Sequence, residues 1–374
     1  MGMTFFAERL RSARLLLGLD NSELSVAARL DHSVVTAIER GQCPLTVDSA
    51  EAVARVTQLP LSFFAVRSAE VPRDSLRLPE DGDLSARMRD RIRQLFAEAL
   101  RVTEVLFEET RYSLPRLPVE ATSADRLSGD RIESVAEHVR AALGLGPDGH
   151  VPYVMRALER HGVAVAPLIL PGSTDAQCLA PGHFGVSFWS GFDGPALVGF
   201  FPGARPDRDR FTLAHELGHL VLHSRRHSVD AEWEANRFAS AFLIPAHRAA
   251  EIFGPDATLI DFARAKAEWG LSIQALIVRA AELGLIGADR AASLCEELRV
   301  RGWRHSEPVE VVAEEPVLLW RMLVNRFGPS PYRSSMAAER LGLPPFVLRA
   351  LAPEPTHAAA VPPPSGQVHQ LRHR

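Results

Sequence analysis

The sequence predicts a mainly α protein with one small β-sheet, an α+β fold class. Apolar residues recur at helical spacing over most of the 374 residues, whereas three β-rich runs gather in one stretch, residues 163–201. Residues 5–64 hold only short helical segments, which cannot bury their apolar faces alone and must therefore pack together. We expect an all-α N-terminal bundle followed by a region that combines helices with the sheet.

Four short helices are expected within residues 5–64. Apolar residues keep helical spacing along them, and a glycine, a proline or a capping side chain marks an end of each. The predicted markers are Gly18 at the end of the first helix, Asn21 or Ser22 as the cap of the second, Ser33 as the cap of the third with Gly41 at its end, and Pro60 after the fourth, which starts at Asp48.

A linker and further helices are expected next. Residues 66–82 are polar and contain proline, which is typical of a linker. A long amphipathic helix is expected from about residue 84 to residue 112, and others at about 130–143 and 153–161. The arginines of the long helix point several ways around it, and we interpret them as a solvated face: Arg87, Arg89, Arg91 and Arg93.

The apolar period changes after residue 162. The runs VAVAPLIL, FGVSFWS and PALVGFF are rich in β-branched and aromatic residues and are separated by glycine and proline, so they predict the small sheet. Helices resume from Asp207 onward. The last stretch, PEPTHAAAVPPPSGQVHQLRHR, is proline-rich and has no apolar period, and we expect it to be disordered.

Composition and charge indicate a globular, cytoplasmic protein without a membrane segment. The net charge of −4 argues against a broadly basic nucleic-acid-binding surface, so any DNA contact would depend on a local surface. Cys43, Cys178 and Cys295 lie far apart and form no CxxC pair, which predicts neither a disulfide framework nor a thiolate metal site. The chain opens with no signal-peptide pattern, and no uninterrupted apolar run approaches about 18 residues.

The stretch DRFTLAHELGH, residues 209–219, carries the most specific chemical pattern. Residues four apart on a helix share a face, so His215 and His219 can direct both rings at one metal ion, with Glu216 beside the open position of that ion. Two imidazoles suit zinc, which lowers the pKa of a water molecule toward neutrality, and a neighbouring carboxylate can take the proton. The alternative is a helix that carries two solvent-exposed histidines.

A third ligand must come from outside this pattern. His223 would lie about 12 Å from His215 along the helix axis, too far to bind the same ion, and we interpret it as structural or surface-facing. The stretch DAEWEANRFASAFLIP predicts a second helix. On it Glu232 and Asn236 share a face, so Glu232 can be a ligand while Asn236 hydrogen-bonds a ligand histidine. Glu234 points to a different side and is the second candidate.

The stretch RFTLAHELGHLVLH, followed by EWEANRFASAFLIP, resembles the ImmA/IrrE family of bacterial metallopeptidases, whose signature joins HExxH to an ExxAN.FA..LL.P pattern on the next helix. The close match runs from Arg210 to Pro245. Residues 265–286 and 301–308 also resemble the helical region that follows in many members, so the resemblance covers most of residues 150–325. It implies a zincin-like metallopeptidase domain with Zn²⁺ held by His215, His219 and Glu232, and with Glu216 as the general base.

The stretch NSELSVAARLDHSVVTAIERG resembles the helix-turn-helix of Cro/C1-type (Xre) DNA-binding domains. In that fold the third helix enters the major groove and the start of the second contacts phosphate. The matching positions are Asn21 for phosphate and His32, Ser33 and Thr36 near the bases. Residues 1–70 hold seven arginines against eight acids, so a monomer should bind DNA weakly, and a homodimer on two half-sites could compensate. The alternative is a bundle for dimerisation or partner binding.

Together the resemblances imply a regulator whose peptidase domain cleaves a repressor or another regulatory protein, while the bundle addresses a DNA operator or recognises the target. The competing hypothesis is a transcriptional regulator without catalysis, whose peptidase-like domain is a sensor or a docking module for a partner. The expected organisation is a helix-turn-helix domain over residues 1–68, a linker and helical segment over 69–149, a metallopeptidase domain over 150–300, a C-terminal helical region over 301–352 and a disordered tail over 353–374.

Overall fold

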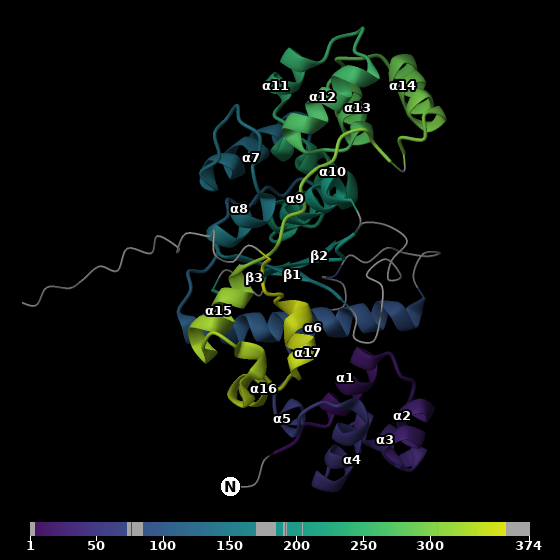
Figure 1. Ribbon diagram of the computed structural model, residues 1–374, viewed down its shortest axis with the longest axis vertical. Helices are drawn as coiled ribbons and strands as arrows, with labels where there is room; N and C mark the ends of the chain where they lie inside the picture. Colours follow the sequence, from purple (N-terminus) through teal and green to yellow (C-terminus); the bar gives the residue numbers. More distant parts are fainter. Residues whose placement is uncertain are drawn as a thin grey trace, which may run out of the picture.

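The computed structural model describes residues 4–72, 76, 85–169, 185–189, 191, 193–203, 205–304 and 306–356 (Figure 1). This part of the chain is mainly helical with one three-stranded sheet, which confirms the predicted fold class. Cys178 and most of the expected disordered tail, residues 357–374, lie outside the described residues. None of the described helices has both the length and the apolar character needed to cross a membrane.

Five short helices form the N-terminal bundle at the lower end of Figure 1. They are α1 (Glu8–Leu17), α2 (Asn21–Ala28), α3 (His32–Glu39), α4 (Val47–Thr57) and α5 (Leu61–Phe64). As predicted, α1 ends at Gly18, which adopts the left-handed conformation with φ 68°. The apolar faces of the helices meet in one core, which contains Leu10, Leu24, Val35 and Val53.

The caps expected for α2 and α3 are wrong by one or two residues. Asp20 caps α2: its carboxylate accepts a hydrogen bond from the Glu23 backbone at 2.8 Å, and the Glu23 carboxylate accepts one from the Asp20 backbone at 2.6 Å. Asp31 caps α3 by accepting from the Ser33 backbone at 2.8 Å. An aspartate caps as well as asparagine or serine does, and its charge also suits the positive end of the helix dipole.

The sheet has the order β1-β3-β2, with β1 (Val163–Pro167) parallel to β3 (Ala196–Phe200) and β2 (Gly185–Trp189) antiparallel to β3. In register, Val163 lies opposite Ala196, and Ser187 lies opposite Val198. All residues of β1 and β3 are buried, because helices cover both faces of the sheet. The sheet therefore divides the molecule into two layers of helices.

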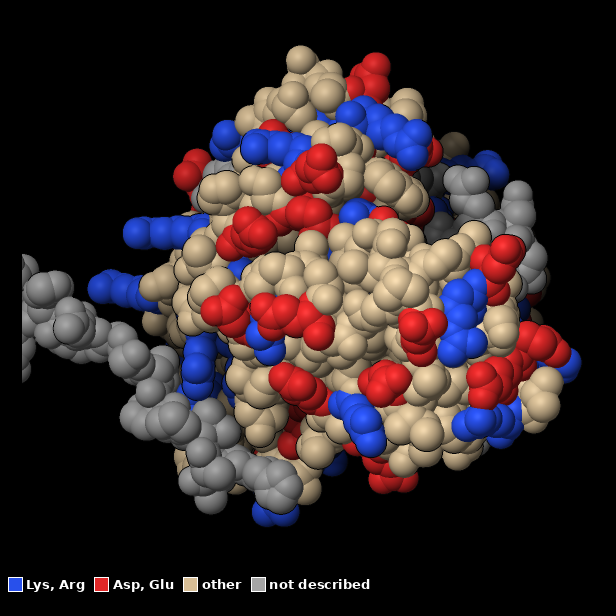
Figure 2. Space-filling view, turned by 90° about the horizontal axis from the view of Figure 1, so that it is seen from above, with Lys and Arg blue, Asp and Glu red and all other residues tan. Residues whose placement is uncertain are grey.

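One face of the sheet packs against the helices drawn above it in Figure 1. They are α7 (Gly129–Ala142), α8 (Val154–Arg160), α9 (Pro206–His223) and α10 (Ala231–Leu243), followed at the upper end by α11 (Ala246–Ile252), α12 (Leu259–Trp269), α13 (Ile273–Glu282) and α14 (Ala288–Val300). Seen from that end, acidic and basic side chains are interspersed on the described surface (Figure 2).

The opposite face of the sheet is covered by the long helix α6 (Ala86–Thr110) and by C-terminal helices. The latter are α15 (Leu318–Phe327), the 3-10 helix η3 (Pro331–Arg333), α16 (Ser335–Leu341) and α17 (Pro345–Leu351). Leu95 and Phe96 of α6 and Leu319 of α15 share a core with Leu197 of β3. The layer beneath the sheet is thus formed by one segment that precedes residues 150–300 in the sequence and one that follows them.

Helix α6 also contacts the N-terminal bundle through polar side chains. The Glu98 carboxylate is 1% exposed and accepts hydrogen bonds from Arg9 of α1 at 2.5 Å and from Arg101 at 2.9 Å. Arg87 donates to the Gly18 carbonyl at 2.6 Å, and Arg91 donates to the Leu16 carbonyl at 3.2 Å. Arg91 is half-buried, so its interpretation as part of a solvated face is corrected, whereas Arg87 stays exposed although it binds a carbonyl at the end of α1.

Candidate metal centre

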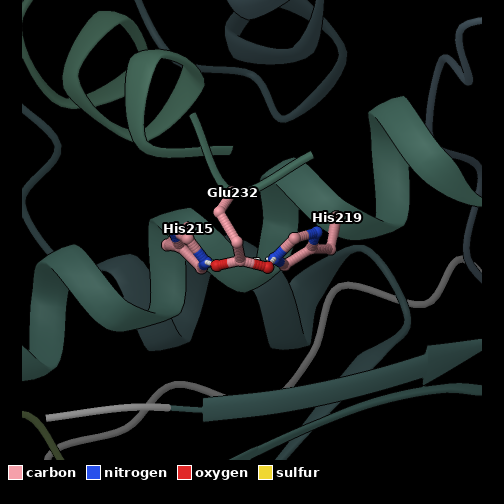
Figure 3. A group of neighbouring side chains, drawn as sticks. All are labelled: His215, His219 and Glu232. Carbon is pink, nitrogen blue, oxygen red and sulfur yellow. Dashed lines mark hydrogen bonds and ion pairs between the residues drawn. The ribbon is translucent and has the colours of Figure 1, made fainter. Parts of the chain in front are cut away.

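Three potential metal ligands meet where α9 packs against α10 (Figure 3). His215 and His219 lie one turn apart on α9, and Glu232 lies in the first turn of α10. The Glu232 carboxylate lies between the two rings, 3.3 Å from each Nε2 atom, and the two Nε2 atoms are 3.0 Å apart. One ligand atom from each residue falls within 4.8 Å of the other two.

Local sequence explains why α9 and α10 come so close. Helix α9 starts at Pro206, whose fixed φ suits the first helical position, and Asp207 and Asp209 lie in its positively polarised first turn. Gly218 faces α10: a Cβ atom there would lie 3.0 Å from the Phe238 ring and 3.3 Å from the Ala235 backbone. Small residues at this contact let the backbones approach far enough for Glu232 to reach both histidines.

The orientation of both rings fits a metal ion. The Asn236 amide oxygen accepts from Nδ1 of His215 at 3.0 Å, and Nδ1 of His219 is 2.9 Å from Nδ1 of His223. With both Nδ1 atoms engaged in this way, the Nε2 lone pairs point at Glu232. Two lone pairs and a carboxylate so close together repel one another unless a cation lies among them, and two imidazoles with a carboxylate are a common ligand set for zinc.

Electrostatics in the site also favour a cation. The pKa of Glu232 lies well below its ordinary value, because His215 and His219 donate hydrogen bonds to this carboxylate whenever their Nε2 atoms carry a proton instead of facing a cation. Burial alone would lower the pKa of His215, but the hydrogen bond to Glu232 and the charge of Glu216 raise it instead. The Glu232 side chain is 63% exposed, so ions and larger ligands can reach the centre from solvent.

Strand β2 holds Glu216 beside this centre. Glu216 is 4% exposed, and the Ser187 hydroxyl donates to its Oε2 atom at 2.7 Å. A Cβ atom at Gly185 would lie 2.6 Å from Cγ of Glu216, so only glycine leaves room for the side chain there. We did not predict either residue of β2 from the sequence. A glycine and a serine in an otherwise apolar strand were the available signal, because glycine in a strand often marks a close approach.

Glu234 and His223 lie behind the ligand cluster and not in it. Glu234 is fully buried, and its carboxylate contacts His223, Arg226 and the Leu127 backbone. The side chain of His223 is only 3% exposed, so of the two interpretations of this residue the structural one fits the geometry.

The positions assigned to DNA contact lie on α2 and α3 of the bundle. His32 and Ser33 are exposed at the start of α3, and the Ser33 hydroxyl donates to the Asp31 carboxylate at 2.7 Å. Asn21 is half-buried at the start of α2. Thr36 is half-buried, and its hydroxyl oxygen is buried without a hydrogen-bond partner among the described residues.

Comparison with known families agrees with this geometry. Residues 201–281 match the model of peptidase family M78, described as the IrrE N-terminal-like domain. The matched segment contains α9 and α10 with the complete ligand cluster, and it supports the ImmA/IrrE family and a peptidase-type enzyme, in a family that is typically metal-dependent. The match does not extend to the N-terminal bundle. The chain matches no curated protein.

Proposed function

We propose that the protein is a zinc-dependent endopeptidase that cleaves a repressor or another regulatory protein. The observation that supports this proposal is the convergence of His215, His219 and Glu232. Glu216 follows His215 directly on the same helix, α9, and is held there by Ser187. When bound by these three residues, zinc would supply a Lewis acid and would lower the pKa of a coordinated water molecule.

The residues around the centre have distinct roles in this proposal. Glu216 takes the proton from the attacking water and delivers it to the leaving amine. Ser187 holds Oε2 of this carboxylate, and the other oxygen lies in the space left by Gly185, 2.9 Å from where a Cβ atom would be. No described strand pairs with the outer edge of β2, so an extended polypeptide can add there through backbone hydrogen bonds. This mode of binding supports a protein substrate.

Metal content tests the centre first. Elemental analysis of protein purified without chelator should find about one zinc per chain, as expected for a site of three protein ligands that leaves one coordination position open. His215→Ala and Glu232→Ala should lose the zinc, whereas His227→Ala, which changes an exposed histidine between α9 and α10, should keep it. A folded wild-type chain without zinc would exclude the proposed enzyme and favour a sensor or docking role for this domain.

We further propose that the bundle binds a DNA operator, as a homodimer on two half-sites. This is favoured by the α2–α3 pair, whose helices are joined by residues 29–31 with Arg29 in the left-handed conformation, a connection typical of a helix-turn-helix. His32 and Ser33 then lie at the exposed start of the helix that would enter the major groove. The low net charge of the bundle is the reason to propose a dimer.

A further inference from the structure

A chain of polar side chains leads from the ligand His219 into the interior. Nδ1 of His219 lies 2.9 Å from Nδ1 of His223, and Nε2 of His223 lies 3.0 Å from Oε2 of Glu234. Arg226 contacts the same carboxylate oxygen, while the Leu127 backbone donates to the other oxygen at 2.8 Å. Arg226 also donates to a backbone carbonyl at residue 124, at 2.8 Å, so the end of the chain is anchored to the segment before α7.

Glu234, the buried residue at the end of this chain of side chains, sets the direction of each hydrogen bond in it. Glu234 has a guanidinium and a backbone N–H as neighbours, so its carboxylate is an acceptor, and Nε2 of His223 must donate to it. A neutral His223 with its proton on Nε2 has a lone pair on Nδ1. His219 must therefore donate from its own Nδ1, so a neutral His219 carries no proton on Nε2.

The two ligand histidines are oriented by different means. His215 is held by the Asn236 amide, whose oxygen accepts from Nδ1 of the ring. His219 is held by another imidazole, which can donate or accept, so the tautomer of His219 depends on what lies beyond His223. In this fold that group is the buried carboxylate of Glu234.

We propose that His223 and Glu234 are positioning residues that fix His219 in the tautomer whose Nε2 lone pair faces the metal centre. The proposal deepens the proposed zinc site and rests on it for its functional meaning. Outer hydrogen-bond partners of ligand histidines contribute about 10-fold to 100-fold to metal affinity. The pair therefore acts on zinc binding through His219 and makes no contact with substrate.

Substitutions at His223 separate this role from simple packing. In His223→Gln the amide oxygen can accept from His219 while the amide nitrogen donates to Glu234, so the hydrogen-bond order is kept. His223→Leu has a similar volume but can do neither. Zinc affinity, measured by competition with a chromogenic chelator, should fall about 10-fold to 100-fold in His223→Leu and stay within a few-fold of wild type in His223→Gln. His227→Leu is the exposed control.

The tautomer itself can be read without any metal. Two-bond ¹⁵N–¹H correlation spectra of the metal-free, full-length protein identify which ring nitrogen of His219 carries the proton. The expected result is a proton on Nδ1 in wild type and in His223→Gln, and its loss from Nδ1 in His223→Leu. A wild-type His219 without a proton on Nδ1, or an unchanged tautomer in His223→Leu, would overturn the proposal. Absence of zinc binding would instead overturn the proposed function, because the tautomer is measured separately.

A second variant, at Glu234, tests the same proposal if His223→Leu does not fold. Glu234→Leu removes the carboxylate that accepts from Nε2 of His223, while Arg226 keeps its bonds to the backbone carbonyls of residues 124 and 222. His223 is then no longer fixed as an acceptor at Nδ1, so the proton of His219 should no longer be confined to Nδ1. A tautomer of His219 unchanged from wild type in this variant would contradict the proposal.

Discussion

At the scale of single residues, two positions of β2 decide where the Glu216 carboxylate lies. Ser187 donates to it at 2.7 Å, and Gly185 leaves the space that its Cγ atom occupies. Neither residue belongs to the candidate ligand cluster, and both contact Glu216, the proposed general base. Substitutions here therefore separate proton transfer from metal binding.

Replacing Glu216 by glutamine should remove the base and keep the metal. Proton transfer by a positioned side chain contributes about 100-fold to 10,000-fold to a rate, so cleavage of a protein substrate should fall by at least about 100-fold. Elemental analysis should still find the zinc content of wild type. Equal cleavage by Glu216→Gln would exclude Glu216 as the general base.

Gly185→Ala should displace Glu216, because the new methyl group would lie 2.6 Å from its Cγ atom. We expect cleavage to fall at least about ten-fold, since a small misplacement of a catalytic group is costly, with zinc affinity unchanged. Gly254→Ala is the matched control, because nothing lies within 4 Å of a Cβ atom there. Full cleavage by Gly185→Ala would mean that the active enzyme does not use this contact between β2 and α9.

At the scale of secondary-structure elements, α6 holds the bundle through the buried group of Arg9, Glu98 and Arg101. Burial by itself raises the pKa of Glu98, but the charges of Arg101 and Arg9 outweigh it and leave that pKa below its ordinary value. The contribution of Glu98 to stability is therefore complete above the ordinary carboxyl pKa and is lost as the pH falls through the lowered value.

Glu98→Leu should lower the free energy of unfolding by about 3–5 kcal/mol at neutral pH, because two buried guanidinium groups lose their counter-ion. Urea titrations at neutral and at acidic pH measure this, and the difference from wild type should shrink in acid. Arg299→Ala breaks an exposed ion pair and should leave the midpoint unchanged. A difference that grows in acid would show that the sign assigned to Glu98 is wrong.

Helix α3 should carry the specificity for DNA, if the bundle binds an operator. Each good contact to a base edge discriminates by about 1–3 kcal/mol, so His32→Ala and Ser33→Ala should each weaken binding to a selected duplex by about five-fold or more. Fluorescence anisotropy at fixed salt measures this. His247→Ala, an exposed histidine on α11 at the opposite end of the molecule, should have no effect. Equal binding by all three variants would favour a bundle that binds a protein partner.

At the scale of the whole molecule, the bundle and the metal centre belong to one packed structure. Leu95 and Ala99 of α6 share a core with Leu10 of the bundle on one side and with Leu197 of the sheet on the other. The opposite face of that sheet packs against α9, which carries both ligand histidines. Binding at the bundle would therefore place the metal centre in a set position relative to the bound partner.

Zinc should stabilise the entire chain, because its ligands come from two helices that unfolding separates. With free zinc at a thousand times Kd, the free energy of unfolding should increase by about 4 kcal/mol. Calorimetry with and without zinc measures the shift in Tm, which should vanish in His215→Ala. An equal shift in that variant would mean that zinc binds elsewhere in the chain.

Much of the candidate site follows from helical periodicity. The spacing of His215 and His219 places both rings on one side of α9, and Glu232 and Asn236 come from one face of α10 for the same reason. Ser187 and Gly185 could not be predicted, because no local pattern says which strand lies against α9. The pairing of Arg9 with Glu98 was equally hidden, since the two residues are 89 positions apart.

By itself the sequence determined the fold class, the order of the elements and the residues able to bind a metal ion, because these depend on periodicity and on side-chain chemistry within about one helical turn. Only the tertiary structure decided that α6 and the C-terminal helices cover the second face of the sheet, that β2 holds Glu216, and that Glu234 lies behind His219. Such contacts join distant segments, and they form only when the apolar faces of those segments are buried together.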